Sequence, residues 1–334
     1  MTKITLKPLA DQVVLITGAS SGIGLVTAKL AATRGARVVL VARNERSLVD
    51  AVAEIEAAGG DAMYAVADVG DIAQVRAAAA AAIARYGRID TWVNDAGTAI
   101  YAKLVDTPLD EHQRLFQTNY FGAVHGSLTA VDHLRDRGGA IITVGSIASD
   151  LPSPILSAYS ASKHAVRGFV DALRMELAAD RLPIAVTLIK PAGIDTPIAQ
   201  NAAKHVDGEG MIPPPVYDPT LVARAILDAA EHVRRDITVG GAGRLQVLIG
   251  EHFPALLDVI APLMEPIMSD PTRRPSPSTI FAPGRHGQER SGVQSGRKTS
   301  LYTAAQLHPA LTRTALLAGS VALAGFLVAR RRDR

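Results

Sequence analysis

Residues 13–24 have the sequence VVLITGASSGIG, in which a short apolar segment runs into a turn with three glycines. The apolar segment is typical of a buried strand, and a helical pattern continues from the turn to Arg34, where Gly35 ends it. A strand, a glycine-rich turn and a helix form a dinucleotide site, because the helix N-terminus stabilises the pyrophosphate. The alternative is a tight turn without a ligand. The predicted cofactor contacts here are Gly18, Ser20, Ser21, Gly22, Ile23 and Gly24.

The end of the second predicted strand, residues 38–41, bears on the choice of cofactor. NAD-binding units usually place an acidic residue there, on the 2′-hydroxyl of the adenosine ribose. This chain has Ala42 and then Arg43. An arginine without a carboxylate suits a 2′-phosphate, so we expect NADP(H) to be preferred over NAD(H). The alternative is an exposed arginine at the start of the next helix.

Strand and helix patterns alternate through the first 250 residues. Further strand patterns end near residues 66, 93, 144, 189 and 239, with helical patterns between them. This alternation predicts an α/β fold with a doubly wound parallel sheet, a Rossmann fold of about seven strands. The residues after the third and fourth strands are placed to meet the cofactor, although an Asp after a strand is also a common helix cap. These predicted contacts are Asp68, Val69, Asn94, Ala96 and Gly97.

Four polar residues are candidates for catalysis. Tyr159 and Lys163 are four residues apart, so they lie on one face of a helix, where an ammonium favours the phenolate and lowers its pKa. Ser146 follows an apolar strand pattern 13 residues before Tyr159 and is placed to bond the oxygen that Tyr159 protonates. Asn119 interrupts an apolar helical stretch and needs a partner, either structural or in the site. The alternative for Tyr159 and Lys163 is a surface pair.

Together these residues resemble the short-chain dehydrogenase/reductase family, over roughly residues 8–250. TGASSGIG (residues 17–24), Asp68, the segment 94–97, Asn119, Ser146, Tyr159, Lys163 and the segment 191–196 occur in the order of that family and at its spacings. Two residues depart from the family pattern, Asp95 in place of its second Asn and Ala192 in place of a Gly.

The resemblance implies a role for each matching residue. Tyr159 is expected to exchange a proton with the substrate oxygen, and Lys163 to hold the nicotinamide ribose and lower the pKa of Tyr159. Ser146 is expected to orient the substrate, and Asn119 to hold a water of the proton relay. Pro191, Ile194 and Thr196 are expected at the nicotinamide carboxamide.

The amino-acid composition excludes several classes of function. The chain has no cysteine, which excludes disulfides and zinc-thiolate sites and fits a cytoplasmic protein, and we expect no metal. The net charge of +3 divides into +9 for residues 271–334 and −6 for the rest. A nucleic-acid enzyme carries its positive charge on the folded body, so we expect no nucleic acid as partner.

The C-terminal part departs from a simple reductase. We expect a catalytic domain over 1–250, a proline-broken apolar helix near the substrate entrance over 251–269, and a disordered linker rich in Pro, Ser, Gly and Arg over 270–308. Residues 314–329 carry no charge and are flanked by arginines. A spanning helix, an interfacial helix and a helix docked on the protein are all open for 309–334, and we favour attachment to a membrane.

We therefore predict an NADP(H)-dependent oxidoreductase that acts on a carbonyl or secondary alcohol, and the tail suggests a lipophilic substrate drawn from the bilayer. The alternative is a regulatory or scaffold protein with the same nucleotide-binding fold and a membrane tether. An epimerase or dehydratase of nucleotide sugars would need a larger substrate domain. The resemblance also implies a homo-dimer or homo-tetramer paired through the helices at about 110–135 and 158–180.

Overall fold

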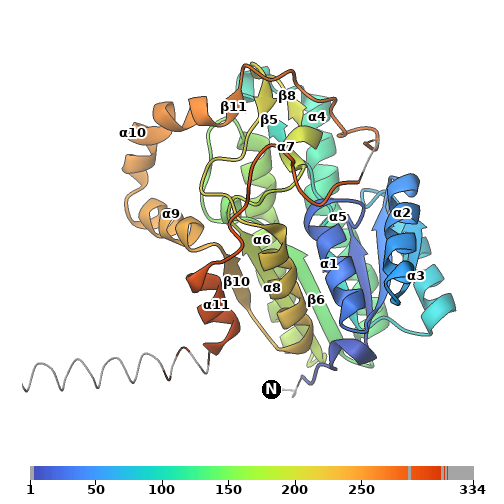
Figure 1. Ribbon diagram of the computed structural model, residues 1–334. Coiled ribbons are helices and arrows are strands. Elements are labelled where there is room, and N and C mark those ends of the chain that lie inside the picture. Colours follow the sequence, from blue (N-terminus) through green and yellow to red (C-terminus); the bar gives the residue numbers. More distant parts are fainter. Residues whose placement is uncertain (1–3, 285–286, 310–311, 313, 315–334) are drawn as a thin grey trace, which may run out of the picture.

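A parallel sheet of seven strands organises the structure, a computed structural model that describes residues 4–284, 287–309, 312 and 314. The strand order is β10-β7-β6-β4-β1-β2-β3, and every neighbouring pair is parallel (Figure 1). The predicted doubly wound fold is confirmed. The strands are β1 (Val13–Thr17), β2 (Arg37–Ala42), β3 (Asp61–Val66), β4 (Thr91–Asn94), β6 (Gly139–Val144), β7 (Ile184–Pro191) and β10 (Asp236–Val239).

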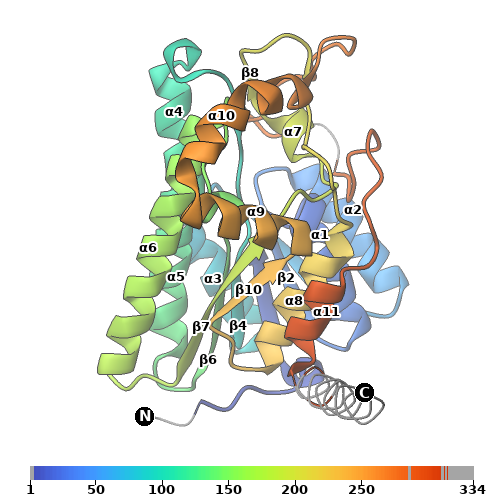
Figure 2. The same cartoon turned by 90° about the vertical axis from the view of Figure 1, so that its left-hand side faces the viewer.

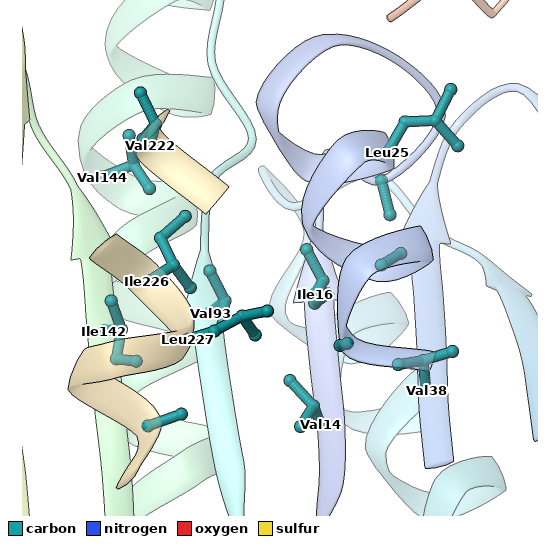
Figure 3. Close-up of a cluster of buried hydrophobic side chains, with 14 of the residues drawn as sticks. Val14, Ile16, Leu25, Val38, Val93, Ile142, Val144, Val222, Ile226 and Leu227 are labelled. Atoms are coloured by element: carbon teal, nitrogen blue, oxygen red, sulfur yellow. The ribbon is translucent and has the colours of Figure 1, made fainter. Parts of the chain in front are cut away.

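Helices cover both faces of the sheet (Figure 2). Successive side chains of a strand point to opposite faces, so Val14 and Ile16 pack against α1, α2 and α8, as the close-up in Figure 3 shows in part, whereas Val13 and Leu15 pack against α3, α5 and α6. Because both faces are buried, the strands are apolar without alternation. The helices are α1 (Gly22–Thr33), α2 (Glu45–Ala57), α3 (Ile72–Tyr86), α5 (Gly122–Leu134), α6 (Ser157–Ala179) and α8 (Pro219–Glu231).

The stretch that we expected as one helix over 110–135 contains a π-helical turn. It consists of α4 (Leu109–Phe116), the turn η3 (Gln117–Phe121) and α5. Such turns are rare and occur mostly as single insertions in α-helices, often at functional sites. Asn119 lies in this turn.

Short elements and a C-terminal pair of helices lie above the carboxyl ends of the strands (Figure 1). α9 and α10 form an arm that leaves the body after β10. The remaining elements are η1 (Leu9–Asp11), β5 (Ile100–Tyr101), η2 (Leu104–Asp106), η4 (Ile147–Ser149), α7 (Ile198–Asn201), β8 (Ala203–Lys204), β9 (Glu209–Gly210), α9 (Gly241–His252), α10 (Pro254–Met264), η5 (Glu265–Ile267), β11 (Ser269–Asp270) and α11 (Leu301–Leu307).

The segment 270–308 differs from the disordered linker that its composition suggested. Apart from residues 285 and 286, it is described, and it lies against the body: Ile280 is buried, and Thr303 accepts a hydrogen bond from the amide of Gly240. At its end, α11 packs beside β10, where Gln306 donates to the carbonyl of Thr238. The segment is held by backbone groups and a few isolated side chains, which leave no periodic pattern in the sequence.

The predicted membrane attachment concerns residues 309–334, and its apolar run, apart from Thr314, lies outside the described residues. In the part of the chain that the structure does describe, no helix is both long enough and apolar enough to span a bilayer. Attachment of the tail therefore stays a prediction from sequence.

Candidate active site

A cavity of about 440 Å³ lies at the carboxyl ends of the strands. Its walls include most of the residues that the sequence predicted, although they come from segments almost 180 residues apart. Gly24, Asn94 and Asn119 are absent from its described lining. The predicted residues that line it are Gly18, Ser20, Ser21, Gly22, Ile23, Arg43, Asp68, Val69, Ala96, Gly97, Ser146, Tyr159, Lys163, Pro191, Ile194 and Thr196.

The glycine-rich turn packs directly on the end of β4. Gly18 has a φ of +74°, and a Cβ there would lie 2.8 Å from the backbone of Ala96. A larger residue would therefore be strained and would push the turn away from the strand. The hydroxyl of Thr17 fixes the same contact, because it accepts hydrogen bonds from the amides of Asp95 and Ala96 at 3.2 and 3.3 Å. Sequence reasoning missed this role of Thr17.

Lys163 and Tyr159 lie on α6, beside the end of β6. Lys163 is 5% exposed, and its Nζ donates to the carbonyl oxygen of Val144 at 2.9 Å. The same Nζ lies 5.7 Å from the centre of the Tyr159 ring. Ser146 is the N-cap of η4, two residues after the end of β6, and its Oγ accepts from the amide of Ala148 at 3.0 Å. The structure thus brings the three predicted groups together.

The pKa of Tyr159 differs from the sequence-based expectation. We expected Lys163 to lower it, but burial raises the pKa of Tyr159, the hydroxyl of Ser146 opposes the rise, and the carboxylate of Asp95 adds to it. Burial also lowers the pKa of Lys163 to about 8, against the favourable charge of Asp95. The ammonium is directed to the carbonyl of Val144, so its effect on the phenol is weak.

Asn119 joins two segments of the site. Its Oδ1 accepts from the amide of Thr98 at 2.8 Å, and its Nδ2 donates to the carbonyl of Thr98 and to Ser162 Oγ, both at 3.0 Å. The buried side chain therefore ties the loop after β4 to α6, the helix of Tyr159. Both amide hydrogens are used in these structural bonds, so the predicted water would need another group of Asn119.

Asn94, predicted as a cofactor contact, lies away from the cavity, whereas its neighbour Asp95 lines it. The side chain of Asn94 is buried below the site, where it accepts from Trp92 Nε1 at 2.8 Å and donates to Ser127 Oγ at 3.0 Å. Asp95 instead lines the cavity, beside the glycine-rich turn. The prediction that Asn94 contacts the cofactor is thus not supported by its position, and the only signal for Asp95 was its departure from the family pattern.

The carboxyl group of Asp95 is buried away from solvent. Burial raises the pKa of its carboxyl group to about 7, while the charge of Lys163 and a hydrogen bond from the amide of Gly24 oppose the rise. A carboxyl group with such a pKa is partly protonated near neutral pH. Asp95 therefore lies between a helix N-terminus and a buried ammonium, and the charge of its carboxyl group depends on pH.

Two arginines meet at the far end of the cavity, beyond β2 and β3. Arg43 donates to the carbonyl oxygens of Thr279 and Ile280 at 2.6 and 3.2 Å. Arg114 forms an ion pair with Asp68, whose other oxygen accepts from the amide of Gly70. The helix cap is Asp71, so the alternative role of Asp68 as a cap is wrong. Arg114 was missed, because no local pattern links it to Asp68.

Ala192, the second departure from the family pattern, is accommodated by glycines across from it. A Cβ on Gly243 would lie 2.6 Å from the Ala192 Cβ, and one on Gly240 would lie 2.8 Å from it. The missing side chains on α9 and before it leave room for this methyl group. The change therefore leaves β7 and its neighbours in register.

The other half of the cavity is apolar. It is lined by Leu151, Leu156 and Ile212 from loops, and by Ile249, Leu257 and Ile260 from α9 and α10. Among the described residues there is no group of acidic or histidine side chains that could hold a metal ion. The arrangement offers a phenol, a hydroxyl and an ammonium at one end of an apolar chamber, which suits proton transfer to a bound oxygen.

Comparisons with known proteins agree on one family. Residues 12–207 match the family model described as short chain dehydrogenase. The uncharacterized oxidoreductase YxnA of Bacillus subtilis is 42% identical over 97% of this chain and 92% of its own length. Dehydrogenase/reductase SDR family member 7B of Danio rerio is 32% identical over 70% of this chain and 79% of its own.

A solved structure agrees in fold. The short chain dehydrogenase/reductase from Burkholderia phymatum in complex with NAD has a TM-score of 0.68, over 81% of this chain and 99% of that one. It is 24% identical in sequence, so the likeness concerns the fold.

Asp95→Asn should make the stability of the protein less dependent on pH. Because the pKa of Asp95 is raised to about 7, the stability that its protonated form contributes is full below about pH 4 and is lost as the pH rises through about 7. The melting temperature of the wild type should therefore fall more between about pH 5 and pH 8 than that of the variant. Asp110→Asn, at an exposed position, is the control. Equal losses in wild type and Asp95→Asn would contradict the assignment.

Proposed function

The chain belongs to the short-chain dehydrogenase family, and on this premise we propose that it transfers a hydride between the nicotinamide of NADP(H) and a carbonyl or secondary alcohol. The observation that carries the proposal is the meeting of Ser146, Tyr159 and Lys163 in one cavity with an apolar half. These three groups together favour an enzyme over a regulatory or scaffold protein of the same fold.

The described residues fit a dinucleotide along the strand ends. The N-terminus of α1 would face the pyrophosphate, where the amide of Ile23 is the donor that neither Asp95 nor the C-terminal segment uses. Lys163 would hold the hydroxyls of the nicotinamide ribose, and Ile194 and Thr196 would lie at the carboxamide. When bound, the cofactor gives or takes the hydride, while the protein supplies orientation and a proton.

Tyr159 is the proposed proton donor in the direction of reduction. A raised pKa keeps its phenol protonated at neutral pH, which suits a group that must give a proton to a developing alkoxide. Ser146 would hold the substrate oxygen beside it. Asn119 would keep the loop after β4 and α6 in place, and a water held near it remains part of the proposal.

Tyr159→Phe should abolish most of the turnover. The substitution keeps the ring and removes only the ionisable hydroxyl, so we expect a fall on the order of 10²-fold or more, as for loss of a general acid. The measurement is NADPH oxidation with a panel of ketones, together with NADPH titration, which should be nearly unchanged. Tyr64→Phe, on β3 and bonded to Glu45, is the matched control. Turnover by Tyr159→Phe at the wild-type rate would refute the role.

Arg43→Ala should reduce the preference for NADPH. A charged hydrogen bond to the 2′-phosphate would be lost, so NADPH should bind about 1.5–3 kcal/mol more weakly. Arg43 also contacts the C-terminal segment, a loss that both cofactors share, and the ratio of the NADH and NADPH dissociation constants isolates the phosphate. The exposed Arg46→Ala is the control. A wild type that binds NADH more tightly than NADPH would contradict the proposal.

The lining of the substrate half supports a lipophilic substrate. A buried apolar chamber favours a carbonyl compound with an apolar body and few polar groups. The proposed tether through residues 309–334 rests on sequence alone, and it would bring the protein to the bilayer in which such substrates dissolve. Co-sedimentation of the full chain with anionic vesicles, and its absence for a chain that ends at residue 312, measures this attachment.

Exposed apolar side chains on α5 and α6 support the proposed homo-dimer or homo-tetramer. Phe121 and Leu128, at α5, are 43% and 49% exposed, and Met175 on α6 is 71% exposed. Leu128→Glu would place a charge in such an interface and should lower the mass in solution, measured by sedimentation. Val105→Glu, which is exposed on η2, should leave the mass unchanged. A wild type that is monomeric at micromolar concentration would end this proposal.

A further inference from the structure

The C-terminal segment crosses the end of the cavity where the adenosine of the proposed cofactor would lie. We call the two described stretches 276–284 and 287–291 the strap. The chain passes from β11 toward the upper ends of α1 and α2, where the strap lies, and then returns to α11 (Figure 1). It lies beyond residue 207, where the match to the family model ends.

Both stretches of the strap bind the cofactor-facing residues through backbone carbonyls. The guanidinium of Arg43 donates to Thr279 and Ile280, and Nε of Arg114 donates to the same Ile280 carbonyl at 3.2 Å. The carbonyl of Gln288 accepts from the amide of Gly22, in the glycine-rich turn, at 2.8 Å. These partners lie just after β2, on α4 and at the start of α1.

Both ends of the strap are fixed to the body. On one side, the amide of Thr279 donates to the carbonyl of Asn201 at 2.9 Å, and Ile280 is buried at 2% exposure. On the other side, the buried Ser291 donates to the carboxylate of Asp195 through its hydroxyl and through its amide, the latter at 3.1 Å. Glu289 adds an ion pair with Lys29 at 2.8 Å.

The cavity continues beneath this crossing. Thr279, Pro283 and Gly284 of the strap line it together with Ser20 and Arg43 of the body. Because both described stretches are bonded to the body, they form an outer wall, and a ligand below it has to pass this wall to enter or leave.

We infer that the strap closes the adenosine end of the cofactor site, and that NADP(H) enters and leaves only when the strap opens. The inference rests on the proposed function, because the ligand is the cofactor of that reaction. It assigns the exchange rate of the cofactor to a segment outside the part of the chain that matches the family model.

Hydrogen exchange with and without NADPH tests whether the strap is part of the site. The amides of 279–284 and 287–291 should exchange more slowly with saturating NADPH, on the order of tenfold for a segment that a bound ligand holds closed. NADPH that binds, by fluorescence titration, and leaves this exchange unchanged would overturn the inference and leave the proposed function intact. Absence of any NADPH binding would refute the proposed function itself, and the inference with it.

Ser291→Ala tests the gating. It removes a buried hydrogen bond to the Asp195 carboxylate at one end of the strap, so the association and dissociation rate constants of NADPH should both rise on the order of tenfold in stopped flow. Ser295→Ala makes the same change at an exposed serine four residues later and should change both constants by less than about twofold.

The two rate constants distinguish a gate from a contact. A strap that merely touches the bound cofactor would raise the dissociation rate alone, and that result would overturn the inference, as would unchanged rates. If Ser291→Ala does not unfold cooperatively, Glu289→Gln, which breaks the ion pair with Lys29, is the second variant, with the same expected increase in both constants.

Discussion

The buried ammonium of Lys163 is the constraint on which the geometry of the site depends. A charge out of water needs a partner, and Lys163 finds it in the carbonyl of Val144, at the end of β6. That bond fixes α6 against the sheet, one helical turn from Tyr159, and places the phenol near Ser146, the second residue after the strand. Asp95 supplies the counter-charge across the cavity. The burial of this one cation thus helps to position the proposed catalytic groups, Ser146 and Tyr159.

The parts of the fold and site that the sequence predicted are those with local patterns. The seven strands, the glycine-rich turn and the spacing of Tyr159 and Lys163 each lie within a short segment. Asn94 shows where such reasoning ends: neighbouring strand residues point to opposite faces, so a shift by one decides whether Asn94 or Asp95 enters the cavity. Asn94 shares the face of Trp92 and bonds to it. At the end of a strand, the sequence pattern does not show which of two neighbouring residues faces the cavity.

The structure differs from the predicted disordered linker over 270–308 for another physical reason. Composition indicates whether a segment can form a hydrophobic core of its own. Residues 270–308 cannot form one. They add to a core that exists already, with Ile280 as one buried anchor and carbonyl groups that satisfy arginines of the body. Backbone acceptors are the same in every residue type, so a segment that binds through them leaves no signature. Arg43 and Arg114 gave no hint that their partners lie more than 160 residues away.

The C-terminal part therefore completes the catalytic domain from outside. α9 and α10 line the apolar half of the cavity, the strap lines the end near Arg43, and α11 covers the edge strand β10. An exposed edge strand invites pairing with other chains, so the last of these contacts also protects the sheet. The glycines that accommodate Ala192 lie at the start of this C-terminal part. They pack on the residue after β7 and so join the sheet to the helices that wall the cavity.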